Sequence, residues 1–268
     1  MKIKFCINDC KNYPGGLMTE VDYHLLGSKP RWKIITPAGH GKTHTIAESL
    51  KYVEGKQLIL THTHAGVASL REKIQNLGIP PQNYALETID SFAQAYVKAF
   101  YCGDDVPDQE SKEYFSFIIK KATKIFESKP VGSVIKATYT GLYVDEYQDC
   151  SASQHQLIMS LVCLGLPVRV LGDHLQGIFD FEDDPLVNFD VDLNEFDEFP
   201  PLEVPWRWKV SGNESLGKTL KQIRCHLEKK ERVNLDLYGG DISVIVINDE
   251  NDKYNPQTEY SKTLWELL

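Results

Sequence analysis

The sequence predicts an α/β fold with a parallel, doubly wound sheet, and three observations support this prediction. Short apolar runs alternate with helical patterns along most of the chain, as they do in parallel sheets covered by helices. One apolar run leads into a glycine-bearing loop and then into a helical pattern, the order of a phosphate-binding loop. Another apolar run ends in two adjacent carboxylates. We therefore expect a binding site at the ends of the strands.

The individual elements follow from hydrophobic periodicity and from turn residues. Buried strands are predicted at 34–35, 57–61, 142–144, 168–171 and 242–247. Helices are predicted at 45–50, 67–77, 93–100, 111–126, 154–164, 214–230 and 259–268. Residues 180–198 contain no Lys or Arg, so we expect an exposed acidic connection there.

Composition restricts the class of protein. The chain has 268 residues, a net charge of −9 and 42% hydrophobic residues, which is typical of a soluble globular protein. No apolar run approaches the roughly 20 residues that span a bilayer, and the N-terminus lacks the apolar core of a signal peptide. We therefore expect no membrane partner and a cytoplasmic location. The acidic total argues against bulk electrostatic binding to nucleic acid, but it leaves room for a local basic groove.

Cysteine and histidine do not predict a structural metal. The six cysteines are scattered, which suits reduced thiols better than a disulfide framework. Cys6 and Cys10 are close in sequence, and His62 and His64 share one predicted strand face, but neither pair has further ligands nearby. A zinc site needs about four ligands, so neither pair is interpreted as one.

The glycine-bearing loop is the stretch Thr36-Pro37-Ala38-Gly39-His40-Gly41-Lys42-Thr43. Backbone N–H groups of such a loop point inward, and the following helix N-terminus adds positive charge, so phosphates bind there. Lys42 is predicted to reach the β- and γ-phosphates of ATP, and the Thr43 hydroxyl to ligate Mg²⁺. Thr36 stands where the consensus has Gly, often Ala.

The carboxylates lie in the stretch Val144-Asp145-Glu146-Tyr147-Gln148-Asp149, at the end of a predicted strand. Asp145 is predicted to hold Mg²⁺, directly or through water. Glu146 is predicted to orient and deprotonate the attacking water. An apolar strand followed by these carboxylates, downstream of Gly-Lys-Thr, indicates hydrolysis of a nucleoside triphosphate.

Residues of about 33–208, which contain these motifs, resemble the ATPase domain of superfamily 1 helicases of the UvrD/Rep type. Further motifs occur in the family's order. They are Thr61-His62-Thr63-His64, Thr88-Ile89-Asp90-Ser91-Phe92, the run from Leu171-Gly172-Asp173 to Gln176-Gly177-Ile178-Phe179-Asp180-Phe181, and Val204-Pro205-Trp206-Arg207. The resemblance implies a RecA-like P-loop NTPase domain.

The resemblance also implies roles for single residues. Gln176 would contact the γ-phosphate or the attacking water, and Arg207 would stabilise charge on the departing phosphoryl group. Trp206 would stack on adenine. The nucleotide-binding set is Gly39, His40, Gly41, Lys42, Thr43, His44 and Trp206. The set expected to meet single-stranded DNA is Thr61, His62, Phe92 and Phe181, where aromatic faces take stacked bases; the alternative for Phe92 and Phe181 is a place in the core.

The resemblance divides the chain into two parts. Residues 1–208 would be the RecA-like ATP-binding domain, with a helical accessory insert at about 93–140. Residues 209–268 would begin a second RecA-like domain and end before its later motifs, including a further arginine that meets the nucleotide. We therefore expect this chain to bind nucleotide but to hydrolyse it poorly and to unwind nothing, unless a partner protein supplies the missing parts.

Two other functions remain open. The first is a regulatory module that senses ATP or DNA and acts with a partner protein such as a nuclease. The second is an RNA helicase of the same superfamily, although Asp-Glu-Tyr-Gln-Asp looks more like the DNA-translocating branch.

Overall fold

The computed structural model describes residues 21–177 and 184–242, and the statements below concern these ranges. They fall into two compact units, residues 21–207 and residues 208–242. Phe181, the predicted helix 259–268 and all but the first residue of the predicted strand 242–247 lie outside the described residues.

The first unit contains a six-stranded sheet in which every pairing is parallel. The strands lie in the order β3-β2-β4-β5-β1-β6. Their bounds are β1 (Arg31–Ile35), β2 (Gln57–Thr61), β3 (Tyr84–Thr88), β4 (Gly141–Val144), β5 (Val168–Gly172) and β6 (Asp197–Glu198). The predicted α/β, RecA-like arrangement with a parallel sheet is confirmed.

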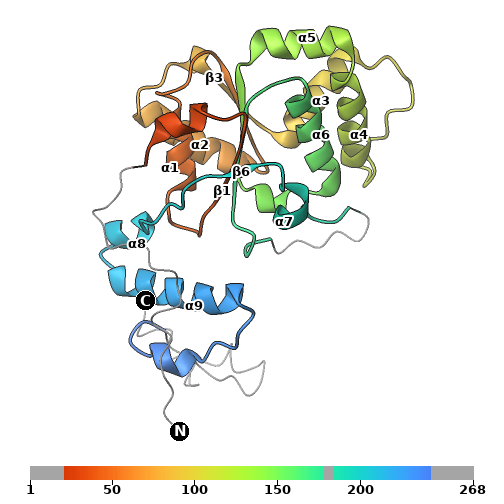
Figure 1. Ribbon diagram of the computed structural model, residues 1–268. Coiled ribbons are helices and arrows are strands. Elements are labelled where there is room, and N and C mark those ends of the chain that lie inside the picture. Colours follow the sequence, from red (N-terminus) through yellow and green to blue (C-terminus); the bar gives the residue numbers. More distant parts are fainter. Residues whose placement is uncertain (1–20, 178–183, 243–268) are drawn as a thin grey trace, which may run out of the picture. The chain divides into compact units, whose positions relative to one another are not determined.

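Helices cover both faces of this sheet (Figure 1). Their bounds are α1 (Lys42–Ser49), α2 (His64–Asn76), α3 (Ile89–Phe100), α4 (Tyr114–Phe126), α5 (Lys129–Thr138), α6 (Ala152–Cys163) and α7 (Phe189–Asp192). In β2, Leu58 and Leu60 pack against the α3–α6 side, whereas Ile59 packs against α1 and α2. Because side chains alternate along a strand, a strand covered on both faces is apolar at nearly every position.

Most predicted helices are confirmed, and several begin earlier than the apolar pattern does. Helix α2 begins at His64 because the Thr63 hydroxyl accepts a hydrogen bond from the Gly66 N–H at 3.0 Å. Helix α3 begins at Ile89 because the Thr88 hydroxyl accepts one from the Ser91 N–H, also at 3.0 Å. Such N-caps satisfy donors that the first turn leaves open, so they fix where a helix starts.

The acidic stretch is not wholly exposed, which corrects our expectation for its described part, residues 184–198. Val187, Phe189, Leu193 and Phe196 are buried in the core. The Phe189 ring lies edge-on to that of Tyr147, with 6.0 Å between centroids. Apolar residues that alternate with the acidic ones pack α7 against the core, and β6 pairs with β1 in the sheet.

The second unit, residues 208–242, contains helix α9 (Glu214–Glu228) and a 3-10 helix, η4 (Leu235–Tyr238). A further short helix, α8 (Trp206–Val210), crosses the boundary between the units. Within the second unit, the hydroxyls of Ser215 and Thr219 each donate to Asp241 at 2.6 Å. The assignment of residues 209–268 to a second RecA-like domain stays a prediction.

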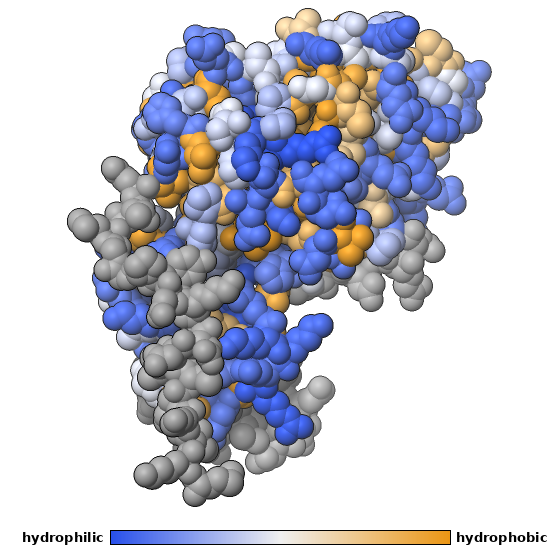
Figure 2. Space-filling view, viewed as in Figure 1, coloured by the Kyte–Doolittle hydropathy of each residue, from blue (hydrophilic) through white to orange (hydrophobic). Residues whose placement is uncertain are grey.

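None of the helices in the described ranges is both long enough and apolar enough to cross a membrane. On the face shown in Figure 2, hydrophilic residues prevail and apolar residues form separate patches.

A buried arginine on the inner strand β5 is hydrogen-bonded to a 3-10 helix near the beginning of the described residues. Arg169 on β5 is 4% exposed and has no carboxylate partner among the described residues. Its Nε and Nη2 donate to the Leu26 carbonyl at 3.0 and 2.7 Å, and its Nη1 donates to the Pro167 carbonyl at 3.3 Å. Burial lowers the pKa of this guanidinium. Leu26 belongs to the 3-10 helix η1 (Tyr23–Gly27), which Arg169 thereby holds in place.

We expect Arg169→Met to lower the free energy of unfolding by about 1–3 kcal/mol, because it removes both hydrogen bonds to the carbonyl of buried Leu26. Urea denaturation would measure the change. Arg31→Met, which removes a partly exposed arginine paired with Glu195, is the control and should change stability by no more than about 0.5 kcal/mol. Equal effects of the two substitutions would contradict the anchoring role of Arg169.

Candidate active site

The strand order places three loops beside one another. Strand β5 lies between β1, which leads into the phosphate loop, and β4, which leads into the carboxylates. The N–H of Thr36 after β1 donates to the Gly172 carbonyl of β5 at 3.1 Å. Since parallel strands end at one edge of the sheet, the residues after β1, β4 and β5 share one site.

The phosphate loop has the backbone that its glycines predict. Gly39 and Gly41 have φ of +78° and +94°. Residues that carry a side chain rarely adopt such a backbone conformation. Gly41 is the N-cap of α1 and has no side chain to bond the first N–H groups of that helix, so these donors face the loop. A Cβ on Gly41 would lie 3.3 Å from Cδ1 of Trp206, which shows that the indole lies against this loop.

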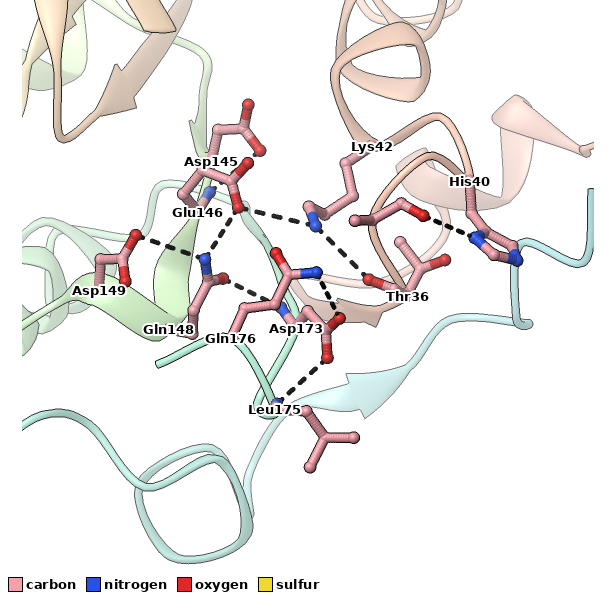
Figure 3. Close-up of polar contacts among 11 residues, drawn as sticks. Thr36, His40, Lys42, Asp145, Glu146, Gln148, Asp149, Asp173, Leu175 and Gln176 are labelled. Carbon is pink, nitrogen blue, oxygen red and sulfur yellow. Dashed lines mark hydrogen bonds and ion pairs between the residues drawn. The ribbon is translucent and has the colours of Figure 1, made fainter. Parts of the chain in front are cut away.

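Lys42 is buried and joins the phosphate loop to the carboxylates. Its Nζ lies 3.5 Å from the Thr36 carbonyl oxygen and 3.6 Å from Oε2 of Glu146 (Figure 3). The Thr36 hydroxyl is buried without a hydrogen-bond partner. Because Thr36 contacts Lys42 through its backbone, a side chain at this position leaves the contact intact.

Asp145 is 4% exposed, and its Oδ1 accepts a hydrogen bond from the Glu146 N–H at 3.0 Å. Burial, reinforced by the neighbouring charge of Glu146, raises its pKa to about 7. Asp145 and Thr43 line a cavity of about 250 Å³ with Glu146 and Asp149. A buried carboxylate that shares a cavity with a hydroxyl and with two further carboxylates fits a divalent cation such as Mg²⁺.

Glu146 has a left-handed backbone, with φ of +52°. A non-glycine residue held in this region costs roughly 1–3 kcal/mol, and such residues cluster at functional sites. Its side chain is 40% exposed, so water has access to the carboxylate. Its Oε2 accepts a hydrogen bond from Nε2 of Gln148 at 2.9 Å.

Gln176 lies in the loop after β5, the strand that lies between β1 and β4 in the sheet. Its Nε2 donates to Oδ2 of Asp173 at 2.9 Å, and Asp173 also accepts a bond from the Leu175 N–H at 3.2 Å. The structure therefore brings Lys42, Asp145, Glu146 and Gln176 to one edge of the sheet, as expected. The Arg207 side chain is exposed, and its backbone N–H donates to the Gly39 carbonyl at 3.0 Å.

A second, larger cavity of about 950 Å³ opens beside the phosphate loop. His40, Gly41, His44 and Trp206 line it, so four of the predicted nucleotide-binding residues share this space. Residues 21–25 and 199–204 form much of the remaining wall. Sequence reasoning did not predict that these two segments line a site, because residues 21–25 and 199–203 have neither a motif nor a clear period.

Two of the four residues expected to contact DNA, Thr61 and Phe92, are buried. Phe92 is 1% exposed and packs against Tyr96 and Phe126 with ring centroids 4.9 and 5.6 Å away. It has no free face for a base, so it is a core residue, which was the alternative. Thr61 is 2% exposed, and Phe181 lies outside the described residues.

His62 lies at the end of β2 and contacts the thiol of Cys150, with 3.3 Å between Nε2 and Sγ. Burial lowers the pKa of this imidazole to about 4, although the charge of Glu146 opposes the shift. A side chain that is neutral at pH 7 offers no charge to a phosphate backbone. It does line the cavity that contains Asp145 and Glu146.

Comparison with known proteins shows that part of the chain matches a family model. Residues 106–197 match the UvrD/REP helicase N-terminal domain. This segment contains Asp145, Glu146 and Gln176 and begins after the phosphate loop. The expected resemblance to UvrD/Rep helicases is confirmed over this range.

Two solved structures of a viral helicase, Arterivirus nonstructural protein 10, match the chain with 16% sequence identity and a TM-score of 0.38. The match covers 67% of this chain and 37% of the helicase in its complex with DNA, and 69% and 38% for the other structure. The chain therefore spans less than two fifths of the length of these helicases. Comparison with curated proteins gave no match.

Proposed function

We propose that this chain is the ATP-binding and ATP-hydrolysing core of a UvrD-like DNA helicase or single-stranded DNA translocase. The observation that carries the proposal is the 3.6 Å separation between Nζ of Lys42 and Oε2 of Glu146. This contact joins a loop built for phosphates to a carboxylate that can accept a proton from water. The family match of residues 106–197 supports the same conclusion.

In this proposal, each residue has one task. The backbone of Gly39, Gly41 and the first turn of α1 binds the phosphates, and Lys42 neutralises their charge. Thr43 and Asp145 would hold Mg²⁺, which supplies charge stabilisation at the phosphates when it is bound.

Glu146 orients the attacking water and takes its proton, and Gln176 contacts the γ-phosphate or that water. Trp206, which lines the 950 Å³ cavity, stacks on adenine. Arg207 stabilises the departing phosphoryl group.

ATP turnover measured with and without single-stranded DNA tests the proposal, with Lys42→Ala as the variant that lacks phosphate binding. We expect this chain to bind ATP and to hydrolyse it slowly, and a longer form joined to a second RecA-like domain to hydrolyse it faster when DNA is added. DNA-stimulated turnover by this chain at the rate of the longer form would contradict the incomplete-core part of the proposal. Absence of ATP binding, or turnover that survives Lys42→Ala, would contradict the whole of it.

A nucleotide-sensing module that acts with a partner protein, such as a nuclease, is the second candidate. The burial of Thr61 and Phe92 favours this candidate, because buried side chains cannot contact DNA. Such a protein would bind ATP without DNA-stimulated turnover in any length of the chain. In either case we propose a cytoplasmic location, since Cys102, Cys150 and Cys163 are free thiols.

A further inference from the structure

Gln148 is a buried side chain with a hydrogen bond at each end of its amide. It lies in the 3-10 helix η3 (Tyr147–Asp149), directly after the catalytic carboxylates, and is 4% exposed. Its Oε1 accepts a bond from the Asp173 N–H at 3.0 Å. Its Nε2 donates to Oε2 of Glu146 at 2.9 Å and lies 3.4 Å from Oδ2 of Asp149.

These bonds continue into the loop after β5. Asp173, whose N–H contacts Gln148, accepts the 2.9 Å bond from Nε2 of Gln176. A chain of contacts therefore runs from Glu146 through Gln148 and Asp173 to Gln176 (Figure 3). It links the proposed general base on one strand end to the proposed γ-phosphate contact on the next.

The backbone around Gln148 leaves little room for it to move independently of this loop. A Cβ on Gly172 would lie 2.8 Å from Oε1 of Gln148, and a Cβ on Gly177 would lie 3.2 Å from its carbonyl oxygen. A side chain at either position would therefore press on Gln148. Gln148 is therefore closely packed against the loop of residues 172–177 and hydrogen-bonded to it through Asp173.

Glu146 depends on this amide once nucleotide is present. Its other side-chain partner among the described residues is Lys42, which turns to the phosphates in the proposed function. Gln148 is then the side chain that keeps the Glu146 carboxylate in place, on a backbone that is itself in the left-handed region.

We infer that Gln148 is a positioning residue, which orients Glu146 for catalysis and couples its position to the loop of residues 172–177. The inference rests on the proposed function and deepens it. The amide suits the task because it accepts from a backbone N–H and donates to a carboxylate at the same time. Neither a carboxylate nor a thioether can do both.

Two variants of Gln148 distinguish its bond to Glu146 from its bond to Asp173, and a variant of Gln154 is the control. Gln148→Met keeps the size of the side chain and loses both bonds. Gln148→Glu keeps an acceptor for the Asp173 N–H but cannot donate to Glu146 and adds a like charge. Gln154→Met is the matched control, since Gln154 caps α6 and contacts Asp90 rather than Glu146. Thermal unfolding of each variant checks that it is folded.

We expect Gln148→Met and Gln148→Glu to lower kcat for ATP by about 10- to 100-fold, because a misplaced general base loses its alignment with the water. KM should change by no more than about threefold, since neither variant touches the phosphate loop. Gln154→Met should leave both constants near those of the wild type.

Amide hydrogen exchange of residues 173–176 in the nucleotide-free protein gives a second readout. Exchange should become faster in Gln148→Met and stay slow in Gln148→Glu, which retains the acceptor. Faster exchange with unchanged kcat would overturn the inference and leave Gln148 a structural residue, and so would a rise in KM at constant kcat. If wild-type protein binds ATP but shows no turnover even in the longer form, the proposed function fails, and this inference fails with it. Normal wild-type turnover with unaffected variants would overturn the inference alone.

Discussion

Replacing Glu146 with glutamine is expected to lower ATP turnover by about 10²- to 10⁴-fold, the usual contribution of a general base. Glutamine has the size of glutamate but cannot take a proton from water. ATP affinity should be equal or slightly higher, because Lys42 then loses the carboxylate that lies 3.6 Å away and is freer to meet phosphate. Fluorescent-nucleotide binding and steady-state turnover would measure the two effects separately.

Glu195→Gln is the matched control for this result. It makes the same chemical change at an exposed residue that pairs with Arg31, far in the sequence from the carboxylate pair. Turnover of Glu195→Gln should equal that of the wild type. If Glu146→Gln retained more than about a third of wild-type turnover, another residue would have to be the base.

Replacing Asp145 with asparagine is expected to stabilise the nucleotide-free protein at pH 8 and to weaken its response to Mg²⁺-nucleotide. The pKa of Asp145 is raised from 3.8 to about 7, first by burial and then by the charge of Glu146. The folded protein therefore holds this proton more tightly than the unfolded chain does. Stability from this group is greatest below about pH 4 and falls as the pH rises from about 4 to about 7.

The loss amounts to about 2–4 kcal/mol in the free energy of unfolding, and Asp145→Asn should abolish it. Urea denaturation between pH 5 and pH 8, without nucleotide or Mg²⁺, would compare the variant with the wild type. The stability gap should be widest at pH 8 and shrink toward pH 5. The control Asp190→Asn, at an exposed position on α7, should follow the wild-type curve. Parallel curves for wild type and Asp145→Asn would contradict the raised pKa.

The buried strands and the meeting of Lys42 with Glu146 were predictable from the sequence for a simple physical reason. Continuous apolar runs mark strands covered on both faces, and parallel strands bring their ends to one edge. Strand β3 was missed because only Leu86 and Thr88 of its residues are buried. Helix α5 lies within the predicted helical insert of about 93–140, but its bounds were not predicted because proline, here Pro130 in its first turn, also occurs where helices stop.

The site shows where sequence reasoning fails. Phe92 was assigned to DNA by its motif, although Ile89, Phe92, Ala93 and Val97 have the spacing of a buried helix face and are all buried. The helical period was therefore the better guide. The contacts of Gln148 could not be predicted, because they depend on the side-chain orientation and on the turn that η3 makes after β4.

The placement of β1 in the sheet has a consequence for synthesis of the chain. Strand β1 pairs with β5 and β6, and the anchor between Leu26 and Arg169 joins residues 143 positions apart. A growing polypeptide therefore carries the phosphate loop out of the ribosome long before any strand exists for β1 to pair with. Contacts between residues far apart in the sequence form late in folding, and apolar surface stays exposed until they form. The first part of the nucleotide site to be translated is thus among the last to acquire its neighbours.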